Sequence, residues 1–465
     1  MKISLVRPNS MAVACPPPIG LGYLAGYLLK HRRDEIEVID ARRLRLKPEA
    51  VTQRLMAMKP DLVGISALSF EAKEAEELAR KFKKALPSVT IVLGGPYPSS
   101  VYESALDEDA IDFAVVGEGE QTFLELINAL DKNEPLDRIS GLVFRKNGKA
   151  HLVGIRAPIP EIDTLEIAWQ VLKPEMYFVS RLRTSENTLR KSARLLPIFT
   201  SRGCPYSCYF CHSIFGKKFR GRSAENVLSE IDYLVKTYGV EELEIIDDSF
   251  NLDLRRAKKI LKGIAERNYR LWLSFPNGIR ADLIDEEFLD LMKSAGTYRV
   301  DYAIESASKD RQIEIGKRLD LEKTRWVIEQ TWKRRIISDG YFILGFPGET
   351  EEEMNQTIEY ALKSKLQLAS FFHLKPFPGT ALAKRYNKSQ QAVDEAQVSD
   401  YSTLTLNLSA VPDAKLRRIR KRAYRRFYFS PFRLWSNFLL APKNFRTLRS
   451  VLDVVLLSFK DSVNY

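Results

Sequence analysis

The chain has 465 residues, of which 45% are hydrophobic and 28% are charged. It is therefore too long for one ordinary domain and too apolar to be disordered. No stretch approaches the roughly 18 uncharged apolar residues that a membrane span needs, and the N-terminus lacks the apolar core of a signal peptide. These features predict two or three folded domains in a cytoplasmic protein.

The net charge of +12 is concentrated in one segment. Residues 411–450 hold twelve basic residues and one acidic residue, which leaves 60 basic and 59 acidic residues in the rest of the chain. A strongly basic domain is typical of nucleic-acid binding. Because the bulk of this chain is close to neutral, we expect no nucleic-acid partner.

The first 130 residues alternate apolar segments with helical patterns. The apolar segments are predicted strands at 2–6, 36–40, 62–66, 90–94 and 113–117. Strands separated by helices indicate βαβ units and a parallel sheet. Gly, Ser or Pro follows several of these strands, at the edge where an open α/β sheet binds its ligands. Residues 1–130 are therefore predicted to form a Rossmann-like, ligand-binding α/β domain.

Residues 131–195 interrupt the pattern with a predicted hairpin at 141–149, and we interpret them as a linker. Six further strands, each followed by a helix pattern, are predicted at 196–200, 243–246, 272–275, 300–304, 338–344 and 368–374. Six βα units are too few for a closed eight-stranded barrel, so residues 196–385 are predicted to form a partial (β/α)6 barrel with its chemistry at the carboxyl ends of the strands. Residues 386–465 are expected to be mainly helical, basic and aromatic.

Three of the four cysteines, Cys204, Cys208 and Cys211, lie within eight residues directly after the first strand of the second domain. This C-x3-C-x2-C spacing lets three thiolates reach one inorganic centre, whereas a closed zinc site needs a fourth ligand. His212 is poorly placed to supply that ligand, so structural zinc is the less favoured alternative. Three thiolates on a four-iron cluster leave one iron open. Cys15 is expected to be an ordinary small residue of the core or of a loop.

The cysteine loop resembles that of the radical S-adenosylmethionine (SAM) superfamily, and segments 245–250, 276–280, 302–306, 340–350 and 376–380 match further motifs of that superfamily in order. The resemblance implies a [4Fe-4S] cluster on the three cysteines, with SAM on its open iron. It also implies SAM contacts by Phe210, Asp248, Arg280, Glu305, Ser306, Gly345, Pro347 and Gly348. Taken alone, a carboxylate such as Glu305 after a strand is more often a helix cap.

The first domain resembles the cobalamin-binding domain of the B12-dependent branch, on segments 18–28, 60–66, 94–96 and 117–120. The resemblance implies cobalamin contacts by Pro18, Gly20, Ser66, Leu68, Gly94, Gly95, Pro96, Gly117, Glu118, Gly119 and Glu120. Glycine pairs alone would also fit plain turns. The D-x-H-x-x-G motif, whose histidine ligates cobalt in cobalamin mutases, is missing from the sequence. We therefore expect cobalamin without a histidine axial ligand.

Together the resemblances imply an enzyme that cleaves SAM to a 5'-deoxyadenosyl radical and methylates an unactivated carbon through methylcobalamin. The alternative is a cyclase, oxidase or ring-rearranging enzyme similar to the anaerobic Mg-protoporphyrin monomethyl ester cyclases. Residues 422–431 of this chain resemble the C-terminal end of those cyclases. A cobalamin sensor is disfavoured, because sensing needs no open-iron cluster.

The expected partners are a small-molecule substrate (a lipid, a tetrapyrrole or a natural-product intermediate) and an electron donor such as flavodoxin or ferredoxin. No catalytic acid or base is assigned; His212 and His373 are expected to be structural, and His373 is the better candidate.

Residues 415–426 contain eight basic residues, and aromatic and aliphatic residues follow at 427–440. This composition is typical of an interfacial membrane segment, which predicts peripheral contact with the inner face of the membrane. A solvated helix packed on the barrel is an equally compatible alternative. RNA binding is less favoured, because no RNA-binding motif accompanies the charge.

Overall fold

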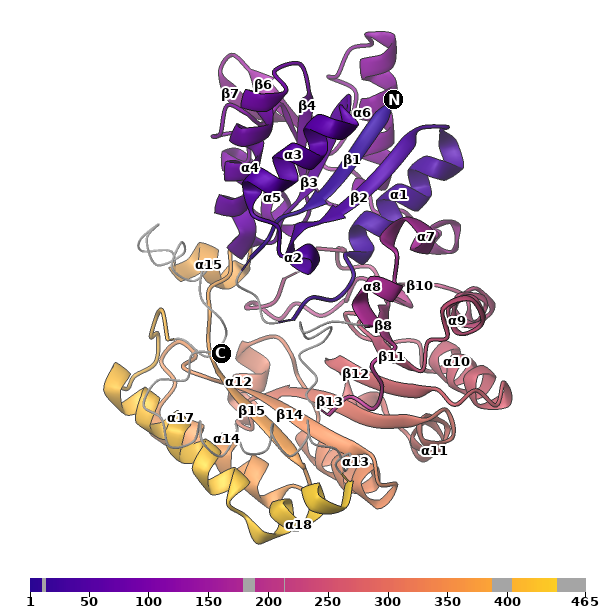
Figure 1. The fold of residues 1–465 in the computed structure, drawn as a ribbon. Coiled ribbons are helices and arrows are strands. Elements are labelled where there is room, and N and C mark those ends of the chain that lie inside the picture. The colour runs from indigo at the N-terminus through magenta and orange to yellow at the C-terminus, as the bar shows by residue number, and fades with distance from the viewer. Residues whose placement is uncertain (11–13, 179–188, 213, 387–403, 441–465) are drawn as a thin grey trace. The chain divides into compact units, whose positions relative to one another are not determined.

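The computed structural model describes residues 1–10, 14–178, 189–212, 214–386 and 404–440. The chain forms two compact units. The first consists of residues 1–184 with the short segments 212–216 and 378–384, and the second consists of 185–211, 217–377 and 385–465. The predicted α/β class is confirmed in both units (Figure 1).

The first unit is built on a seven-stranded sheet in the order β2-β1-β3-β4-β5-β6-β7. Its parallel strands are β1 (Lys2–Arg7), β2 (Glu35–Asp40), β3 (Leu62–Ser66), β4 (Thr90–Gly94) and β5 (Phe113–Val115), as the sequence predicts. The predicted hairpin forms as β6 (Leu142–Lys146) and β7 (Lys149–Leu152). Because β6 pairs antiparallel with β5, the segment that we interpreted as a linker begins by completing this sheet.

Helices cover both faces of this sheet, because the strands are apolar on both sides and bury two separate cores. On one face, Val63 and Leu93 of the strands pack with Leu55 and Phe82 of α3 and α4. On the other, Leu5 and Val92 pack with residues of α1 and α6. Figure 1 shows these two layers. The helices are α1 (Ile19–His31), α2 (Ala41–Leu44), α3 (Pro48–Met58), α4 (Ala72–Ala85), α5 (Pro96–Ser100), α6 (Gly119–Lys132), α7 (Trp169–Leu172) and α8 (Glu175–Phe178).

The second unit contains a six-stranded parallel sheet in the order β15-β14-β13-β12-β11-β8, which is the arrangement expected of a partial (β/α)6 barrel. The strands are β8 (Leu195–Ile198), β11 (Glu242–Ile245), β12 (Trp272–Ile279), β13 (Thr297–Glu305), β14 (Ile337–Leu344) and β15 (Leu368–His373). A short antiparallel pair, β9 (Ser201–Arg202) and β10 (Arg220–Gly221), brackets the cysteine segment. Strand β12 runs further than predicted, because a register shift lets Ile279 pair with Tyr302 of β13.

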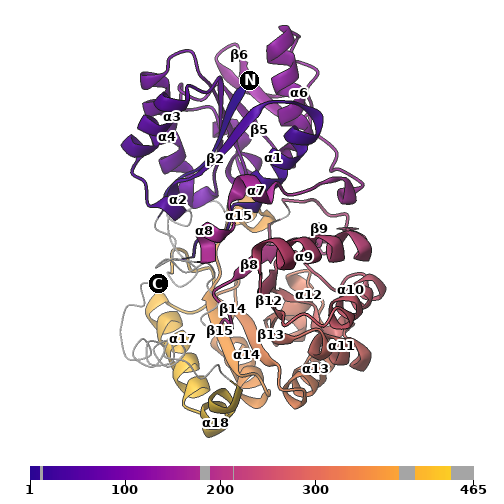
Figure 2. The ribbon, with the colours of Figure 1, turned by 45° about the vertical axis from the view of Figure 1, so that its right-hand side comes forward.

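Helices follow the strands along the chain, and the longer ones lie on the outer side of this sheet (Figure 2). They are α9 (Ala224–Tyr238), α10 (Leu254–Glu266), α11 (Glu286–Ser294), α12 (Lys309–Glu314), α13 (Leu321–Lys333) and α14 (Glu351–Lys363). Polar N-caps fix where several of them begin; the side chains of Ser223, Asp253 and Asp285 each accept a hydrogen bond from the backbone three residues on. Short helix α15 (Ala381–Tyr386) follows β15.

Two helices of the basic region, α17 (Asp413–Tyr428) and α18 (Pro431–Leu440), complete the second unit. Helix α17 packs on β15, the edge strand, whose amides at Ala369 and Phe371 donate to the hydroxyls of Tyr428 and Tyr424. The helical prediction for 386–465 is thus confirmed for 413–440, whereas residues 404–412 form no helix. Residues 387–403 and 441–465 lie outside the described part. Among the described residues, no helix is long and apolar enough to cross a membrane.

Candidate cluster and cofactor sites

The three predicted cluster ligands lie on the loop between β9 and β10, beyond the carboxyl end of β8, and none of them is in a disulfide. The backbone of this loop is held at several points. The amide of Gly203 donates to Asp248 over 3.0 Å, and the amide of Tyr209 donates to the carbonyl of Ile315 over 3.3 Å. The ammonium of Lys217 donates to the carbonyl of Tyr206 over 2.7 Å. The loop is therefore anchored to the residues after β11 and to the end of α12, and the Lys217–Tyr206 bond closes it internally.

The two carboxylates after β11 stabilise the start of this loop. Asp247 is buried and accepts hydrogen bonds from the amide of Thr200 over 2.6 Å and the hydroxyl of Ser201 over 2.6 Å. Burial raises the pKa of Asp247 and that of Asp248. Asp248, predicted as a SAM contact, thus supports the cysteine loop through Gly203.

Glu305, predicted to contact SAM, ends β13 with a backbone φ of +68°, a conformation that residues with a Cβ rarely adopt. Its carboxylate accepts from the ammonium of Lys317 over 2.9 Å, and both side chains are largely buried. Burial works to lower the pKa of Lys317, but Glu305 and the neighbouring Cys208 outweigh it, so the pKa is raised. A fixed positive charge therefore lies beside the cysteine loop. Lys317 has no sequence signal of its own, and the sequence analysis missed it.

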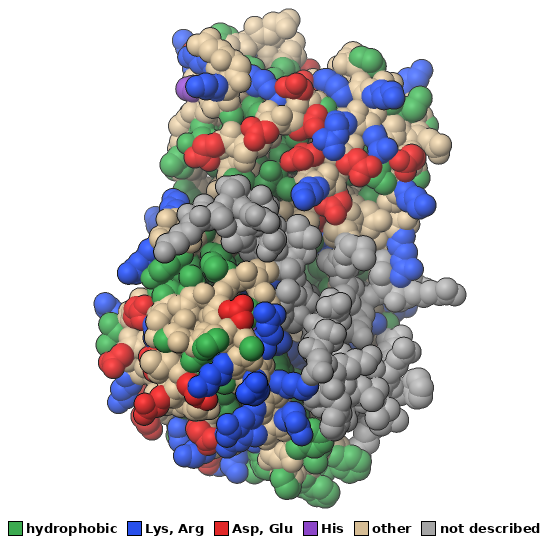
Figure 3. Space-filling view, turned by 90° about the vertical axis from the view of Figure 1, so that its left-hand side faces the viewer, with side chains coloured by type: hydrophobic (Ala, Val, Ile, Leu, Met, Phe, Trp, Pro, Cys, Tyr) green, Lys and Arg blue, Asp and Glu red, His purple; other side chains and the backbone are tan. Residues whose placement is uncertain are grey.

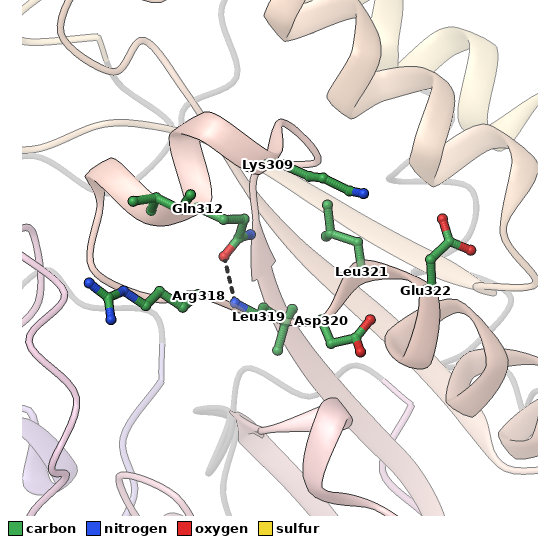
Figure 4. A pocket seen from close by; sticks show the side chains of 8 residues that line it. Lys309, Gln312, Arg318, Leu319, Asp320, Leu321 and Glu322 are labelled. Carbon is green, nitrogen blue, oxygen red and sulfur yellow. Dashed lines mark hydrogen bonds between the residues drawn. The ribbon is translucent and has the colours of Figure 1, made fainter.

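The segment that carries Lys317 is fixed by Gln312, whose amide donates to the carbonyls of Ile304 and Ser306 over 2.7 and 2.6 Å. Its oxygen accepts from the amide of Leu319 over 3.1 Å, which is the dashed line in Figure 4. A surface hollow of about 580 Å³ opens here, lined by Lys309, Gln312, Ile313, Arg318, Leu319, Asp320, Leu321 and Glu322. None of the predicted ligands lines it, so we do not assign a cofactor to it.

Gly316 lies against the cysteine loop with φ +73°. A Cβ at this position would meet the carbonyl oxygen of Ser207 at 2.7 Å, so only glycine fits without displacing the loop.

Two other predicted SAM contacts are engaged within the protein. The guanidinium of Arg280 lies 3.9 Å from the ring centroid of Tyr206 and donates to the carbonyl of Lys317 over 2.9 Å. It thereby connects the cysteine loop with the Lys317 segment. Ser306 is buried, and its hydroxyl is bonded to Ser308 and Thr357. Its side chain therefore holds the end of β13 in place.

The predicted glycine-rich turn after β14 is fixed by Glu349, a residue that the sequence analysis missed. Its carboxylate accepts from the amides of Gly345 and Phe346 over 2.7 and 3.1 Å. Burial raises the pKa of Glu349 to about 7. The ring of Phe346 lies 5.9 Å from that of Phe210, edge to face, so the turn and the cysteine loop are in contact. Two segments predicted to bind SAM thus meet in the structure.

The same turn is supported from two further sides. Arg311 of α12 donates to the carbonyl of Pro347 over 2.9 Å. The amide of Gly348 donates to the carbonyl of Leu408 over 2.9 Å, so the segment before α17 pairs with the turn. These contacts hold the backbone at Gly345, Pro347 and Gly348 in one conformation.

In the first unit, the predicted cobalamin contacts gather at one edge of the sheet. Ser66, Gly94 and Gly117 lie at or just beyond the carboxyl ends of β3, β4 and β5, which are neighbours in the sheet. No atom lies within 4 Å of a Cβ built on Gly94 or Gly117, so the backbone there is open to a ligand. Gly95 differs, because its Cβ would meet Ala67 and Ser66 at 2.9 Å. Its role is to let the turn close.

The other predicted contacts lie at the starts of the helices that follow these strands. Pro18 and Gly20 begin α1, Pro96 begins α5, and Gly119 begins α6 with the buried Glu120. The carboxylate of Glu118 accepts from the amide of Ile159 over 2.9 Å. Leu68 is partly exposed before α4. Helix starts present backbone N–H groups, which suits a polar ligand at this edge.

Comparison with known proteins matches this division of the chain. The model of the B12 binding domain matches residues 11–127, and that of the radical SAM superfamily matches residues 198–361. An uncharacterized methyltransferase of Pyrococcus horikoshii is 31% identical over 443 residues, covering 93% of both chains. The chain belongs to the cobalamin-dependent radical SAM family. The resemblance stated from the sequence is thereby confirmed.

The chain is also similar to a curated cyclase and to a solved structure. The anaerobic magnesium-protoporphyrin IX monomethyl ester cyclase of Rubrivivax gelatinosus is 26% identical, covering 92% of this chain and 78% of its own. The solved structure of the radical SAM methyltransferase TsrM from Kitasatospora setae superposes with a TM-score of 0.72 and 19% identity, covering 96% of this chain and 91% of that chain. The latter likeness confirms the fold.

The residues present fit the groups that this family carries. In the described part of the chain, no three His, Cys, Asp or Glu side chains form a ready ligand set for a metal ion. A four-iron cluster is wider than one ion, so its thiolates need not converge on a point. Three cysteine thiols outside any disulfide, on one anchored loop, are a donor set that fits such a cluster. The open backbone at Gly94 and Gly117 likewise offers cobalamin an accessible sheet edge.

The two histidines weighed as catalytic candidates both have a lowered pKa, which favours their neutral form. His373, at the end of β15, is buried, and burial together with Arg420 and Arg417 lowers its pKa to about 3. It is therefore neutral at physiological pH. His212 is half-buried, and burial lowers its pKa as well.

Proposed function

We propose that this protein is a cobalamin-dependent radical SAM methyltransferase that acts on an unactivated carbon of a small molecule. The observation that carries the proposal is the anchored loop at the carboxyl end of the partial barrel, with three cysteines that are in no disulfide. A separate sheet edge in the first unit, open at Gly94 and Gly117, supports the second cofactor. The implied groups are a [4Fe-4S] cluster, SAM and cobalamin.

When bound, these groups supply the radical and the methyl group that carbon methylation needs. The chain supplies binding and orientation. Cys204, Cys208 and Cys211 would hold the cluster on the loop that Asp248 anchors. Glu305 and the turn at Gly345 would bind SAM, and the Lys317–Glu305 pair fixes the charge beside the loop. Phe346 is fully buried, and its ring packs edge to face against the ring of Phe210, which joins the turn to the cysteine loop.

The second candidate function is radical cyclisation or oxidation without methyl transfer, which the cyclase relative from Rubrivivax gelatinosus favours. Methyl transfer is better supported, because the methyltransferase relative is more similar and matches the chain over 93% of both lengths. The cyclase is 26% identical and has 22% of its own length outside the match.

The cluster assignment is tested by substituting each loop cysteine with serine and measuring iron and sulfide after anaerobic reconstitution. We expect Cys208→Ser to lose most of the bound iron, since one of three thiolate ligands is removed. The matched control is Cys15→Ser, because Cys15 is a buried cysteine of the first unit. Equal iron content in the two variants would contradict the assignment.

The finer identity of the partners is also a proposal. The substrate class is a lipid, a tetrapyrrole or a natural-product intermediate, and the reductant is a one-electron donor of the flavodoxin or ferredoxin type. A peripheral membrane contact through residues 411–450 is a separate proposal, because it rests on α17 and α18 and not on the cofactor sites. Residues 441–450 of that segment lie outside the described part of the chain.

A further inference from the structure

We propose that the outer faces of α17 and α18 form a docking surface for an anionic lipid bilayer. The inner faces of both helices already have partners in the second unit. Leu416, Ala423 and Phe427 of α17 are buried against the barrel. Arg433 of α18 is buried and donates to the carbonyls of Ala361, Leu362 and Ser364 at the end of α14. The outer faces of α17 and α18 are exposed to solvent and available to contact a partner.

The outer face of α17 is strongly cationic. Its exposed basic residues are Lys415, Arg417, Arg418, Arg422, Arg425 and Arg426. Lys415 and Arg426 pair with Glu351 and Glu359 of α14 over 2.5 and 2.6 Å. Among the described residues, no acidic partner is found for Arg418, Arg422 or Arg425, although these residues recur along one side of the helix. Such a stripe is complementary to an anionic surface.

The outer face of α18 is apolar. Leu434, Trp435, Phe438 and Leu439 are 54%, 63%, 65% and 54% exposed, and they recur on one side of the helix. The rings of Trp435 and Phe438 stack with centroids 6.2 Å apart. The neighbouring Phe429, between the helices, is 47% exposed. Figure 3 shows hydrophobic side chains at the lower end of the molecule directly beside a group of basic ones. A soluble protein rarely leaves such a cluster in water.

A cationic face beside an exposed apolar face fits a lipid bilayer better than it fits RNA. Cations next to exposed aromatic and leucine side chains are the signature of a helix that lies in the membrane interface. RNA would use the arginines of α17, but it would gain little from Leu434 and Leu439. The described part of α18 has 10 residues, and no described helix is long and apolar enough to span a membrane, so we place α18 along the surface.

The test is co-sedimentation of the full chain with vesicles. A truncation before Asp413 is not used, because it would also expose the edge strand β15 that α17 covers. Vesicles of phosphatidylcholine with a third phosphatidylglycerol are compared with pure phosphatidylcholine. We expect binding to the anionic vesicles that weakens with salt. R418E/R422E/R425E and, separately, W435S/F438S should each weaken it by roughly tenfold or more.

Matched controls distinguish this surface from general charge and hydrophobicity. R255E/K259E/K262E makes the same charge change on exposed residues of α10. I155S/I313S removes two apolar side chains that are 86% and 61% exposed. Both controls should bind as the unmodified chain does, and circular dichroism should show that all variants are folded. The proposal is overturned if the test and control variants bind the anionic vesicles equally well, or if the unmodified chain binds neither kind of vesicle. Binding to RNA but not to vesicles would also overturn it. None of these outcomes depends on methyltransferase activity.

Discussion

The charged side chains around the cysteine loop are held by named partners rather than by solvent. Glu305 and Lys317 form a buried ion pair there, with 10% and 12% of their side chains exposed. Removing one member of such a pair leaves an uncompensated charge, which costs more than the intact pair contributes.

Lys317→Met should destabilise the cluster-free protein by about 3 kcal/mol, because it leaves the Glu305 carboxylate buried without its cation. Adding Glu305→Gln should restore most of that loss. Urea unfolding measures both. The control is Lys258→Met, whose partners Asp285 and Glu287 are 48% and 70% exposed, and it should cost less than about 1 kcal/mol. Equal losses for Lys317→Met and Lys258→Met would show that the pair is not buried as described.

Glu349 gives a pH-dependent prediction. Its pKa is about 7 in the folded chain and 4.5 ordinarily, so between these values the folded state keeps a proton that the unfolded state releases. This contribution to stability is full below about pH 4.5 and is lost as pH rises through about 7. Relative to Glu349→Gln, the unmodified chain should therefore lose roughly 3 kcal/mol between these limits. Urea unfolding across this pH range checks it; a constant difference between the two proteins would contradict it.

The site residues that the sequence reveals are those with a local pattern. Cys204, Cys208 and Cys211 are predictable because their spacing within one loop is itself the signal. Lys317 was not predictable, because only the fold brings it beside Glu305 and Cys208. Gln312 and Glu349 bond backbone groups close to them in sequence, but a single Gln or Glu near a turn has no pattern of its own. The sequence also shows no difference between Asp248, which anchors the cysteine loop, and a carboxylate that faces a ligand.

Among the secondary-structure elements, the edge strand β15 has the most unusual protection. The tyrosine hydroxyls of α17 accept from its amides, and Arg420 donates to the carbonyl of Phe371 over 2.7 Å. Side chains therefore replace the neighbouring strand that a closed barrel would provide, and they prevent pairing with another chain. The basic helix has a structural role in addition to the docking proposed for its outer face.

Tyr424→Phe should cost about 1–3 kcal/mol, because the partly buried amide of Phe371 then loses its hydrogen-bond acceptor. Thermal or urea unfolding measures the change. Tyr233→Phe is the matched control, since Tyr233 is 42% exposed and its hydroxyl is hydrogen-bonded to the exposed hydroxyl of Tyr238. If both substitutions have the same small effect, α17 does not protect the edge strand.

The elements were predicted well where hydrophobic periodicity is strong. All five parallel strands of the first unit and all six of the second form within a few residues of the predicted bounds. The hairpin at 141–149 was predicted, but its place in the first sheet was not, because pairing with β5 depends on residues distant in sequence. The longer β12 depends likewise on a register shift against β13.

For the whole molecule, the net charge of +12 no longer indicates a nucleic-acid partner. It marks a cationic helix on an otherwise nearly neutral enzyme of the cobalamin-dependent radical SAM family. The first unit presents an open sheet edge at Gly94 and Gly117, and the second unit carries the anchored cysteine loop. The substrate is not encoded in any local pattern, because specificity comes from side chains that several strand ends contribute.

The central claim is methyl transfer to carbon. Its most direct test is anaerobic incubation of the reconstituted enzyme with methyl-deuterated SAM, a reductant and a small-molecule extract of cells that carry the protein. Mass spectrometry then follows the products, with Cys208→Ser as the inactive control. We predict S-adenosylhomocysteine, 5'-deoxyadenosine and a product heavier by one labelled methyl group. Formation of 5'-deoxyadenosine without S-adenosylhomocysteine or a labelled product would contradict the account and favour the cyclase-type reaction.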